Sequence, residues 1–339
     1  MMKKSLLGGL ILSLCTTPAF ALNILLVNDD GLTSNIKALY DELKANGHNV
    51  LVSVPCSPQS GRGGAIVMYS STTITADNDK QIAAENGCHN GAAPIGAPAA
   101  GTFTKAGYTN GDWNYTHGTP VMATVYGLDV VAPKRWGKAP DLVLSGPNEG
   151  QNVGKVVVHS GTIGNVQFSA GRGIPSIALS ADTNTVDDKT LNNPNSAIVA
   201  KQTVVLLKEL QAKAGKGQLL PKGITLNVNF PKNLTTSTPF AFSKIGTYDL
   251  YKLKFQVTKD NKGNNQFGLG IDAAPSAPTA SQMSDESAVM QSKIAVTAMQ
   301  VAYDQRPAGQ EWLKIRLKAY LTSKEQDHET LFIGFTPWA

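Results

Sequence analysis

Apolar and polar positions along the first part of the chain predict a strand, a helix and a second strand. Residues 23–27 are a largely apolar run, which is typical of a strand buried on both faces of a parallel sheet. Apolar positions in residues 36–43 recur at helical spacing, with Ser34 or Asn35 as a cap, and residues 49–54 supply the second strand. A strand–helix–strand unit of this length implies a right-handed crossover and a doubly wound α/β sheet.

The same alternation resumes in the middle of the chain. It predicts strands at residues 141–144, 176–179 and 224–229, and helices at residues 162–171 and 196–212. We therefore predict an α/β fold with a doubly wound, mainly parallel sheet.

Other stretches depart from this pattern. Residues 83–107 are rich in Ala and Gly and cannot bury much apolar surface, which indicates an inserted loop. Beyond Pro231, polar alternation with scattered aromatic residues favours C-terminal β-hairpin or arm extensions, and residues 258–283 indicate another flexible loop. We divide the chain into a leader at 1–21, a catalytic core at 22–232, oligomerisation arms at 233–302 and a C-terminal extension at 303–339.

The first 21 residues have the three parts of a secretory signal peptide. A basic start at Lys3 and Lys4 precedes a short apolar stretch and an A-x-A ending at Ala21. We expect cleavage after Ala21 and a periplasmic or secreted protein, with a buried first helix as the alternative. Because an exported protein meets an oxidising compartment, Cys56 and Cys88 could pair, although two separately buried thiols remain the alternative.

Composition narrows the class of protein. The 339 residues are 42% apolar and 16% charged, which excludes a coiled coil and a long disordered polyelectrolyte. The net charge of +5 comes without a Lys/Arg cluster, so we expect no binding to a nucleic-acid duplex. No stretch approaches 18 consecutive apolar residues, so we expect no membrane span.

Polar clusters follow three predicted strands, at the edge where open α/β sheets bind ligands. They are residues 28–31, 57–64 and 145–148. The adjacent carboxylates of Asp29 and Asp30 repel each other unless a cation joins them, and oxygen ligands suit Mg²⁺ or Mn²⁺. The alternative is an ordinary Asn-Asp-Asp-Gly turn.

A second cluster points to an anion. Ser160 and Thr162 stand where a helix begins, so free backbone N–H groups and hydroxyls there would suit a phosphate, whereas a simple N-cap is the alternative. A dication and an anion pocket at one sheet edge fit phosphoryl hydrolysis by metal-activated water. His159 could protonate the leaving oxygen, and Arg62 is expected to be an exposed loop residue.

The ordered motifs resemble those of the SurE family (survival protein SurE, 5′/3′-nucleotidases and acid phosphatases). They cover most of residues 23–302. The matching segments are residues 24–31, 60–61, 117–120, 145–150, 159–162, 173–180, 226–231, 284–285 and 295–300.

The resemblance implies a Rossmann-like, metal-dependent phosphomonoesterase whose C-terminal arms are exchanged in a homodimer or homotetramer. Nucleoside 5′- and 3′-monophosphates are the implied substrates, and Mg or Mn is the implied cofactor. By the resemblance, Asp29, Asp30, Ser60 and Asn148 hold the metal, and Asn152, Ser160, Gly161 and Thr162 bind substrate. Together with His159, whose role rests on its place beside the predicted phosphate site, Asp29, Asp30 and Ser160 are the catalytic candidates.

The sequence also departs from the family pattern. It carries a leader, lacks an Asp-Arg pair before Ser60, and has no evident counterpart for residues 83–107 and 303–339. An exported, non-catalytic nucleotide- or phosphate-binding protein is the competing hypothesis. The tandem aspartates weigh against it, because a pure anion binder gains nothing from two negative charges facing its ligand.

Overall fold

The computed structural model describes residues 20–67, 71–77, 79–215, 217–273, 276–303 and 307–321. The predicted leader, apart from its last two residues, and the end of the predicted extension lie outside these residues. The chain divides into two compact units, one ending at Val301 and the other beginning at Ala302.

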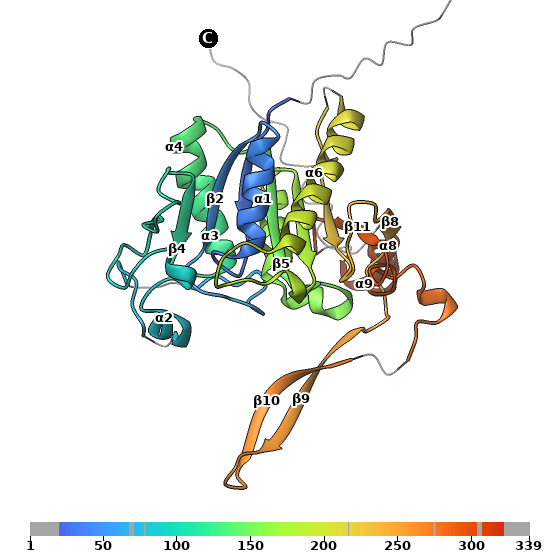
Figure 1. Cartoon of the computed structure of the whole chain (residues 1–339). Coiled ribbons are helices and arrows are strands. Elements are labelled where there is room, and N and C mark those ends of the chain that lie inside the picture. The colour runs from blue at the N-terminus through green and yellow to red at the C-terminus, as the bar shows by residue number, and fades with distance from the viewer. Residues whose placement is uncertain are drawn as a thin grey trace, which may run out of the picture. The chain divides into compact units, whose positions relative to one another are not determined.

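A nine-stranded sheet forms the centre of the first unit, in the order β3-β4-β2-β1-β5-β6-β7-β11-β8 (Figure 1). The neighbours from β4 to β7 are parallel, whereas β3 and β11 run antiparallel to β4 and β7. The prediction of a doubly wound, mainly parallel α/β sheet is confirmed, and its parallel part has the Rossmann strand order. The strands are β1 (Asn23–Val27), β2 (Asn49–Pro55), β3 (Ala100–Thr102), β4 (Trp113–Thr116), β5 (Leu142–Glu149), β6 (Ser176–Ala181), β7 (Ile224–Asn229), β8 (Phe240–Ser243) and β11 (Ile294–Gln300).

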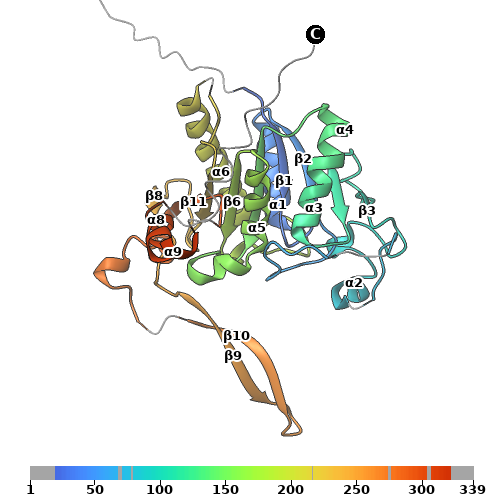
Figure 2. The same cartoon turned by 180° about the vertical axis from the view of Figure 1, so that it is seen from behind.

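Helices cover both faces of this sheet. Figure 1 shows α1 (Ser34–Ala45) and α6 (Pro194–Ala214) in front of it, and Figure 2 shows α3 (Pro120–Tyr126), α4 (Ala132–Trp136) and α5 (Gly161–Gly171) on the opposite face. Shorter helical segments are α2 (Lys80–Glu85), η1 (His89–Gly91), η2 (Gly127–Val131), η3 (Gly154–His159), η4 (Thr183–Thr185), η5 (Ala280–Gln282) and α7 (Glu286–Val289).

The central strand β1 shows why its sequence is apolar throughout. Ile24 and Leu26 pack into the core cluster on the α1 side, whereas Leu25 and Val27 pack into the cluster on the α4 side. All four side chains are completely buried. Successive side chains of a strand point to opposite faces, so a strand covered on both sides needs apolar residues at every position.

The cap of α1 differs from the predicted one. Thr33, not Ser34 or Asn35, is the N-cap, and its hydroxyl accepts a hydrogen bond from the Ile36 amide. The Ser34 and Asn35 side chains are buried and instead donate to the Thr185 backbone oxygen and hydroxyl, respectively. These two hydrogen bonds hold the start of α1 against the segment before α6.

The inserted segment at 83–107 has more structure than an inserted loop. It contains η1 and the edge strand β3, which pairs with β4. Phe103, Tyr108 and Trp113 pack together with ring centroids 4.9–6.2 Å apart. Cys56 and Cys88 form a disulfide, which decides between the two alternatives that the sequence left open.

Residues beyond β8 form a hairpin where the sequence indicated a flexible loop at 258–283. β9 (Tyr251–Lys259) and β10 (Asn265–Ala273) pair antiparallel, so that part of the prediction is wrong. Gly268 and Gly270 hid the period-2 pattern of β10. The strand register puts Leu253, Phe255, Val257, Phe267, Leu269 and Ile271 on one face, and all six are exposed.

The second unit, taken by itself, contains α8 (Pro307–Arg316) and α9 (Lys318–Leu321) in its described part. Across the described ranges of the chain, no helix combines the length and apolar character that crossing a bilayer requires.

Candidate active site

The three predicted polar clusters lie at the carboxyl ends of β1, β2 and β5, which are neighbours in the sheet. Two of them follow β1 and β2, whereas residues 145–148 belong to the last part of β5. Since these strands are parallel, their carboxyl ends lie at one edge. Crossovers leave β1 and β5 toward opposite sides, which makes this edge the topological switch point of the fold, where ligands of open α/β sheets bind.

The loop that carries the two aspartates is held by its own first residue. The Asn28 side chain donates to the Gly31 carbonyl (2.7 Å) and accepts from the Gly31 amide (3.0 Å). Gly31 has φ +84°, a conformation that favours glycine. Asn165 of α5 donates to the Asn28 carbonyl (3.2 Å), so the turn is also fixed to the helix.

Asp29 lies against the start of α5. The Thr162 hydroxyl donates to Asp29 Oδ1 at 2.7 Å, and both side chains are buried. A Cβ added to Gly161 would stand 2.7 Å from Asp29 Cβ, so only glycine allows this approach. Burial raises the pKa of Asp29, although hydrogen bonds from Thr162 and from the Gly161 backbone act in the opposite direction.

Asp30 faces the end of β5. Its Oδ2 accepts from the Glu149 amide (3.2 Å). Burial, and then the negative charges of Asp29 and Glu149, raise the pKa of Asp30 well above its ordinary value. The pKa of Glu149 is raised to about 7, mainly by burial and next by the negative charge of Asp188. Among the described residues, Glu149 Oε1 is buried without a hydrogen-bond partner.

These carboxylates have the chemistry of a hard-cation site. Among the described residues, no ion pair joins Asp29, Asp30 or Glu149 to a lysine or arginine. The same residues contain no group of three or more His, Cys, Asp or Glu arranged to hold a metal. A metal here would therefore need neutral oxygen ligands beside the aspartates, which Mg²⁺ and Mn²⁺ accept.

Two predicted neutral ligands flank the aspartates, Asn148 from the end of β5 and Ser60 from the loop after β2. Asn148 is half-buried at the end of β5, and its Nδ2 donates to the Gly150 carbonyl (2.7 Å), which leaves Oδ1 as the acceptor. Ser60 is exposed, and its neighbour Gln59 donates its amide to the Asp29 carbonyl at 2.8 Å. The Ser60 loop therefore contacts the backbone of the aspartate loop.

The predicted phosphate residues surround the start of α5. Ser160 is the N-cap, and its Oγ accepts from the Ile163 amide at 3.1 Å. Asn152 Nδ2 donates to Ser180 Oγ (2.8 Å) and lies 3.5 Å from Thr162 Oγ1. Through Thr162, which donates its hydroxyl proton to Asp29, the predicted anion pocket joins the predicted metal site.

His159 lies at the outer side of this region. It is exposed and lines a pocket of about 220 Å³ with Lys155, Tyr251 and neighbouring residues of η3 and β9. Its carbonyl accepts from the Gly63 amide (2.9 Å), which holds the Ser60 loop against the start of α5. Arg62 is exposed, as predicted.

Four side chains at this edge are absent from the prediction: Glu149, Asp188, His89 and Asn165. Glu149 stands within the motif at 145–150, so its position beside Asn148 was a usable signal. Asp188 and His89 come from distant segments, and their proximity to each other (3.4 Å) depends on the fold.

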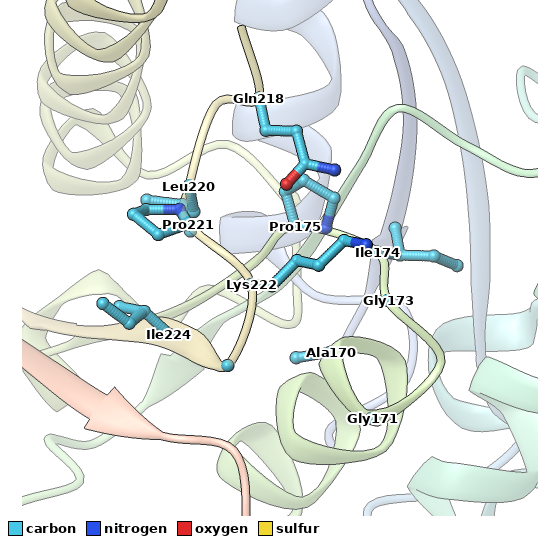
Figure 3. A pocket seen from close by; sticks show the side chains of 11 residues that line it. Ala170, Gly171, Gly173, Ile174, Pro175, Gln218, Leu220, Pro221, Lys222 and Ile224 are labelled. Carbon is cyan, nitrogen blue, oxygen red and sulfur yellow. The ribbon is translucent and has the colours of Figure 1, made fainter.

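A smaller pocket lies at the opposite edge of the sheet. It has a volume of about 110 Å³ and is lined by residues between α5 and β6 and by those before β7. Figure 3 shows Gln218 and Lys222 near the turn through Gly173 and Pro175. It contains none of the predicted site residues.

Comparisons with known proteins agree with the motif resemblance. An acid phosphatase from Yarrowia lipolytica is 39% identical over 215 residues, which are 61% of this chain and 56% of that protein. The 5′-nucleotidase SurE of Lawsonia intracellularis is 32% identical over 213 residues, covering 62% of this chain and 66% of that protein. The chain thus spans between half and two thirds of the length of these relatives.

A solved structure shows the same fold. The crystal structure of the SurE protein from Aquifex aeolicus has a TM-score of 0.61, with 24% identity, and the alignment covers 87% of this chain and 99% of that one. The family model described as Survival protein SurE matches residues 24–251, a range that includes all the site residues discussed above. The chain therefore belongs to the SurE family.

Proposed function

We propose that this chain is a divalent-metal-dependent phosphomonoesterase that hydrolyses nucleoside 5′- and 3′-monophosphates. The observation that carries the proposal is the pair of adjacent, buried carboxylates beside the start of α5. Burying two such charges is costly unless they are protonated or bind a cation. The two relatives described above, an acid phosphatase and a 5′-nucleotidase, support this reaction class.

Asp29, Asp30, Ser60 and Asn148 are the residues that would hold Mg²⁺ or Mn²⁺. When bound, the ion supplies Lewis-acid polarisation of a phosphate oxygen and a lowered pKa for a bound water. The protein's contribution is to orient the ligands, and Asp29 is already oriented by the Thr162 hydroxyl.

The start of α5 is the proposed phosphate site. Its first backbone N–H groups have no partner within the helix, and they favour an anion. The Ser160 hydroxyl accepts from the Ile163 amide, so its own proton remains available for a phosphate oxygen. Asn152 would support this phosphate site through its hydrogen bond to Ser180. His159, the residue before Ser160, is the proposed donor of a proton to the leaving oxygen.

The competing function is that of a non-catalytic binder of nucleotides or phosphate. A helix start alone would serve such a protein. Two buried carboxylates beside it disfavour anion binding unless a cation is present, so metal dependence separates the two functions.

The direct test is turnover of p-nitrophenyl phosphate, 5′-AMP and 3′-AMP with Mg²⁺ or Mn²⁺ and again after EDTA. We expect release of phosphate that stops with EDTA and returns when the metal is restored. Nucleotide binding without turnover under every divalent ion tested would favour the competing function.

We also propose that the β9–β10 hairpin contacts a second copy of the chain. Six exposed apolar side chains form one face of this two-stranded ribbon. Isolated hairpins are only marginally stable, and contiguous exposed apolar faces mark contact sites. A homodimer or homotetramer in which the β9–β10 hairpins contact a neighbouring subunit would cover that apolar face.

Export to the periplasm or beyond is the remaining proposal. Its support is the leader-like composition of residues 1–21 and the Cys56–Cys88 disulfide, since disulfides persist in oxidising compartments. Mass spectrometry of the secreted or periplasmic fraction should find a mature chain that begins after Ala21. A full-length chain retained in the cytoplasm would contradict export.

A further inference from the structure

The inserted segment reaches the aspartate loop through the disulfide. Cys56 directly follows β2, and Cys88 directly precedes η1. Both half-cystines are buried. The next residue, His89, donates its amide to the Cys56 carbonyl at 2.7 Å. The covalent link therefore holds His89 and Asn90 at the carboxyl end of β2, which neighbours β1 in the sheet.

Asn90 contacts the end of the aspartate loop. Its Nδ2 donates to the Leu32 carbonyl at 2.8 Å, two residues after Asp30. The same amide group donates to Asp188 Oδ1 at 3.1 Å, and the Asn90 backbone amide donates to Glu85 at 2.6 Å. The Asn90 side chain thus joins the aspartate loop to the Asp188 segment, and the Asn90 backbone joins both to Glu85.

His89 supports the same loop by packing. A Cβ added to Gly31 would stand 3.4 Å from His89 Cβ and 3.1 Å from the Pro55 carbonyl oxygen, so the loop backbone lies closely against both. The His89 ring bridges Glu85 (2.7 Å) and Asp188 (3.4 Å). The loop is therefore held from two ends, by Asn28 at its start and by Asn90 at its finish.

We propose that Asn90 is a positioning residue that keeps Asp29 and Asp30 in a metal-binding arrangement, with the Cys56–Cys88 disulfide holding Asn90 in place. This inference rests on the proposed function, and it gives the insertion at 83–107 a role in the site. Asn90 would not touch the ion or the substrate. Groups that orient metal ligands from outside the ligand set affect metal affinity by about 10–100-fold when removed.

The chain offers a closely matched pair of variants. Asn90 and Asn86 both have left-handed backbone conformations, with φ 54° and φ 52°. Asn86 is exposed, and no hydrogen bond of its side chain is found among the described residues. Glycine adopts this conformation without strain, so Asn90→Gly and Asn86→Gly each remove a side chain at equal backbone cost.

The experiment measures Mn²⁺ binding by calorimetry on the oxidised, full-length protein, and hydrogen exchange on the metal-free protein. We expect Asn90→Gly to raise the Mn²⁺ dissociation constant about tenfold. It should also speed up exchange at residues 29–32, with exchange elsewhere unchanged. Excess Mn²⁺ should restore kcat. Asn86→Gly should match the wild type in every measurement.

Two results would overturn the inference. One is an Asn90→Gly protein with a Mn²⁺ dissociation constant within twofold of the wild type and unchanged exchange at residues 29–32. The other is accelerated exchange throughout the fold, because that would make Asn90 a general structural residue. Failure of the wild type to bind Mn²⁺ or to turn over phosphoesters is a separate result, which would overturn the proposed function instead.

Discussion

The carboxyl edge of the sheet and the β9–β10 hairpin are opposite departures from ordinary burial. At the sheet edge, Asp29 and Asp30 are 3% and 6% exposed although they are acidic. On the hairpin, Phe255 and Leu269 are 62% and 73% exposed although they are apolar. One region has charges removed from water and the other has hydrocarbon left in it.

This difference shows what each region lacks. Buried carboxylates are stabilised by a cation, whereas exposed apolar side chains are stabilised by another apolar surface. The single chain provides neither among its described residues. The comparison therefore supports both proposals, binding of an ion at the sheet edge and of a protein surface at the hairpin.

Asp30→Asn should have the largest effect. The variant keeps the shape of the side chain and removes one metal-ligating charge, so phosphatase activity should fall by about 10³-fold or more. The metal-free variant should have a higher melting temperature than the wild type, because one buried negative charge is gone. Steady-state kinetics and calorimetry measure both.

Asp41→Asn is the matched control for this variant. Asp41 is exposed and pairs with Lys37 on the surface of α1, so its loss should change neither quantity appreciably. Wild-type turnover by Asp30→Asn would contradict the assigned site.

Changes on the apolar face of the hairpin should have the next largest effect. Phe255 and Leu269 lie directly opposite each other in the strand register. Replacing both by Ser removes about 1.5–3 kcal/mol of burial for each side chain covered in an assembly. Analytical ultracentrifugation should show a shift toward monomer.

Gln256→Ser with Gln266→Ser changes the other face of the same hairpin and should leave the assembly intact. An equal shift by both pairs of substitutions, or a wild type that is monomeric at every concentration, would contradict the proposed contact.

Removal of the disulfide should destabilise the fold by a smaller but measurable amount. Cys56 and Cys88 are 32 residues apart, and a loop of that size contributes about 3–4 kcal/mol in the chain-entropy account. Urea unfolding of Cys56→Ala with Cys88→Ala should show this loss. The wild type unfolded with a reductant should lose a similar amount, and no change in either experiment would contradict a stabilising disulfide.

The pH dependence of the metal-free protein should be the smallest effect. The pKa of Glu149 is about 7 when folded and 4.5 ordinarily, so between these values the native state binds the proton that the unfolded state has released. Stability from this group is therefore present below pH 4.5 and is lost as the pH rises through 7. The raised pKa values of Asp29 and Asp30 act in the same direction.

Urea unfolding between pH 5 and pH 8 measures this slope, and Glu149→Gln should reduce it. Identical slopes in the two proteins would show that Glu149 titrates normally. Added Mn²⁺ should stabilise the wild type more at pH 8 than at pH 5, since ion and proton compete for the same carboxylates.

Local sequence patterns predicted the elements whose burial is uniform. The prediction for β1 matches the structure, and α6 differs from its prediction by two residues at each end. β5 continues to Glu149, well past the predicted end at residue 144, because pairing with β6 resumes after an irregularity between Ser145 and Asn148. Polar residues at that end hid the continuation of the strand.

In the candidate site, too, some residues could be located from the sequence and others could not. Asp29 and Asp30 lie just after β1, and Asn148 lies in the last part of β5, so motif and strand order together placed them at one edge. The roles of Asp188, His89 and Asn90 depend on segments far apart in the chain. Spacing carries no information about such contacts, and even the Cys56–Cys88 disulfide beside His89 was one of two alternatives.

The most direct test of the central claim is anomalous scattering from crystals of the protein grown with Mn²⁺. We expect a manganese peak between the carboxylates of Asp29 and Asp30, with the Asn148 side-chain oxygen among its ligands. Carboxylates that point apart with no ion between them, at a Mn²⁺ concentration that supports catalysis, would contradict it.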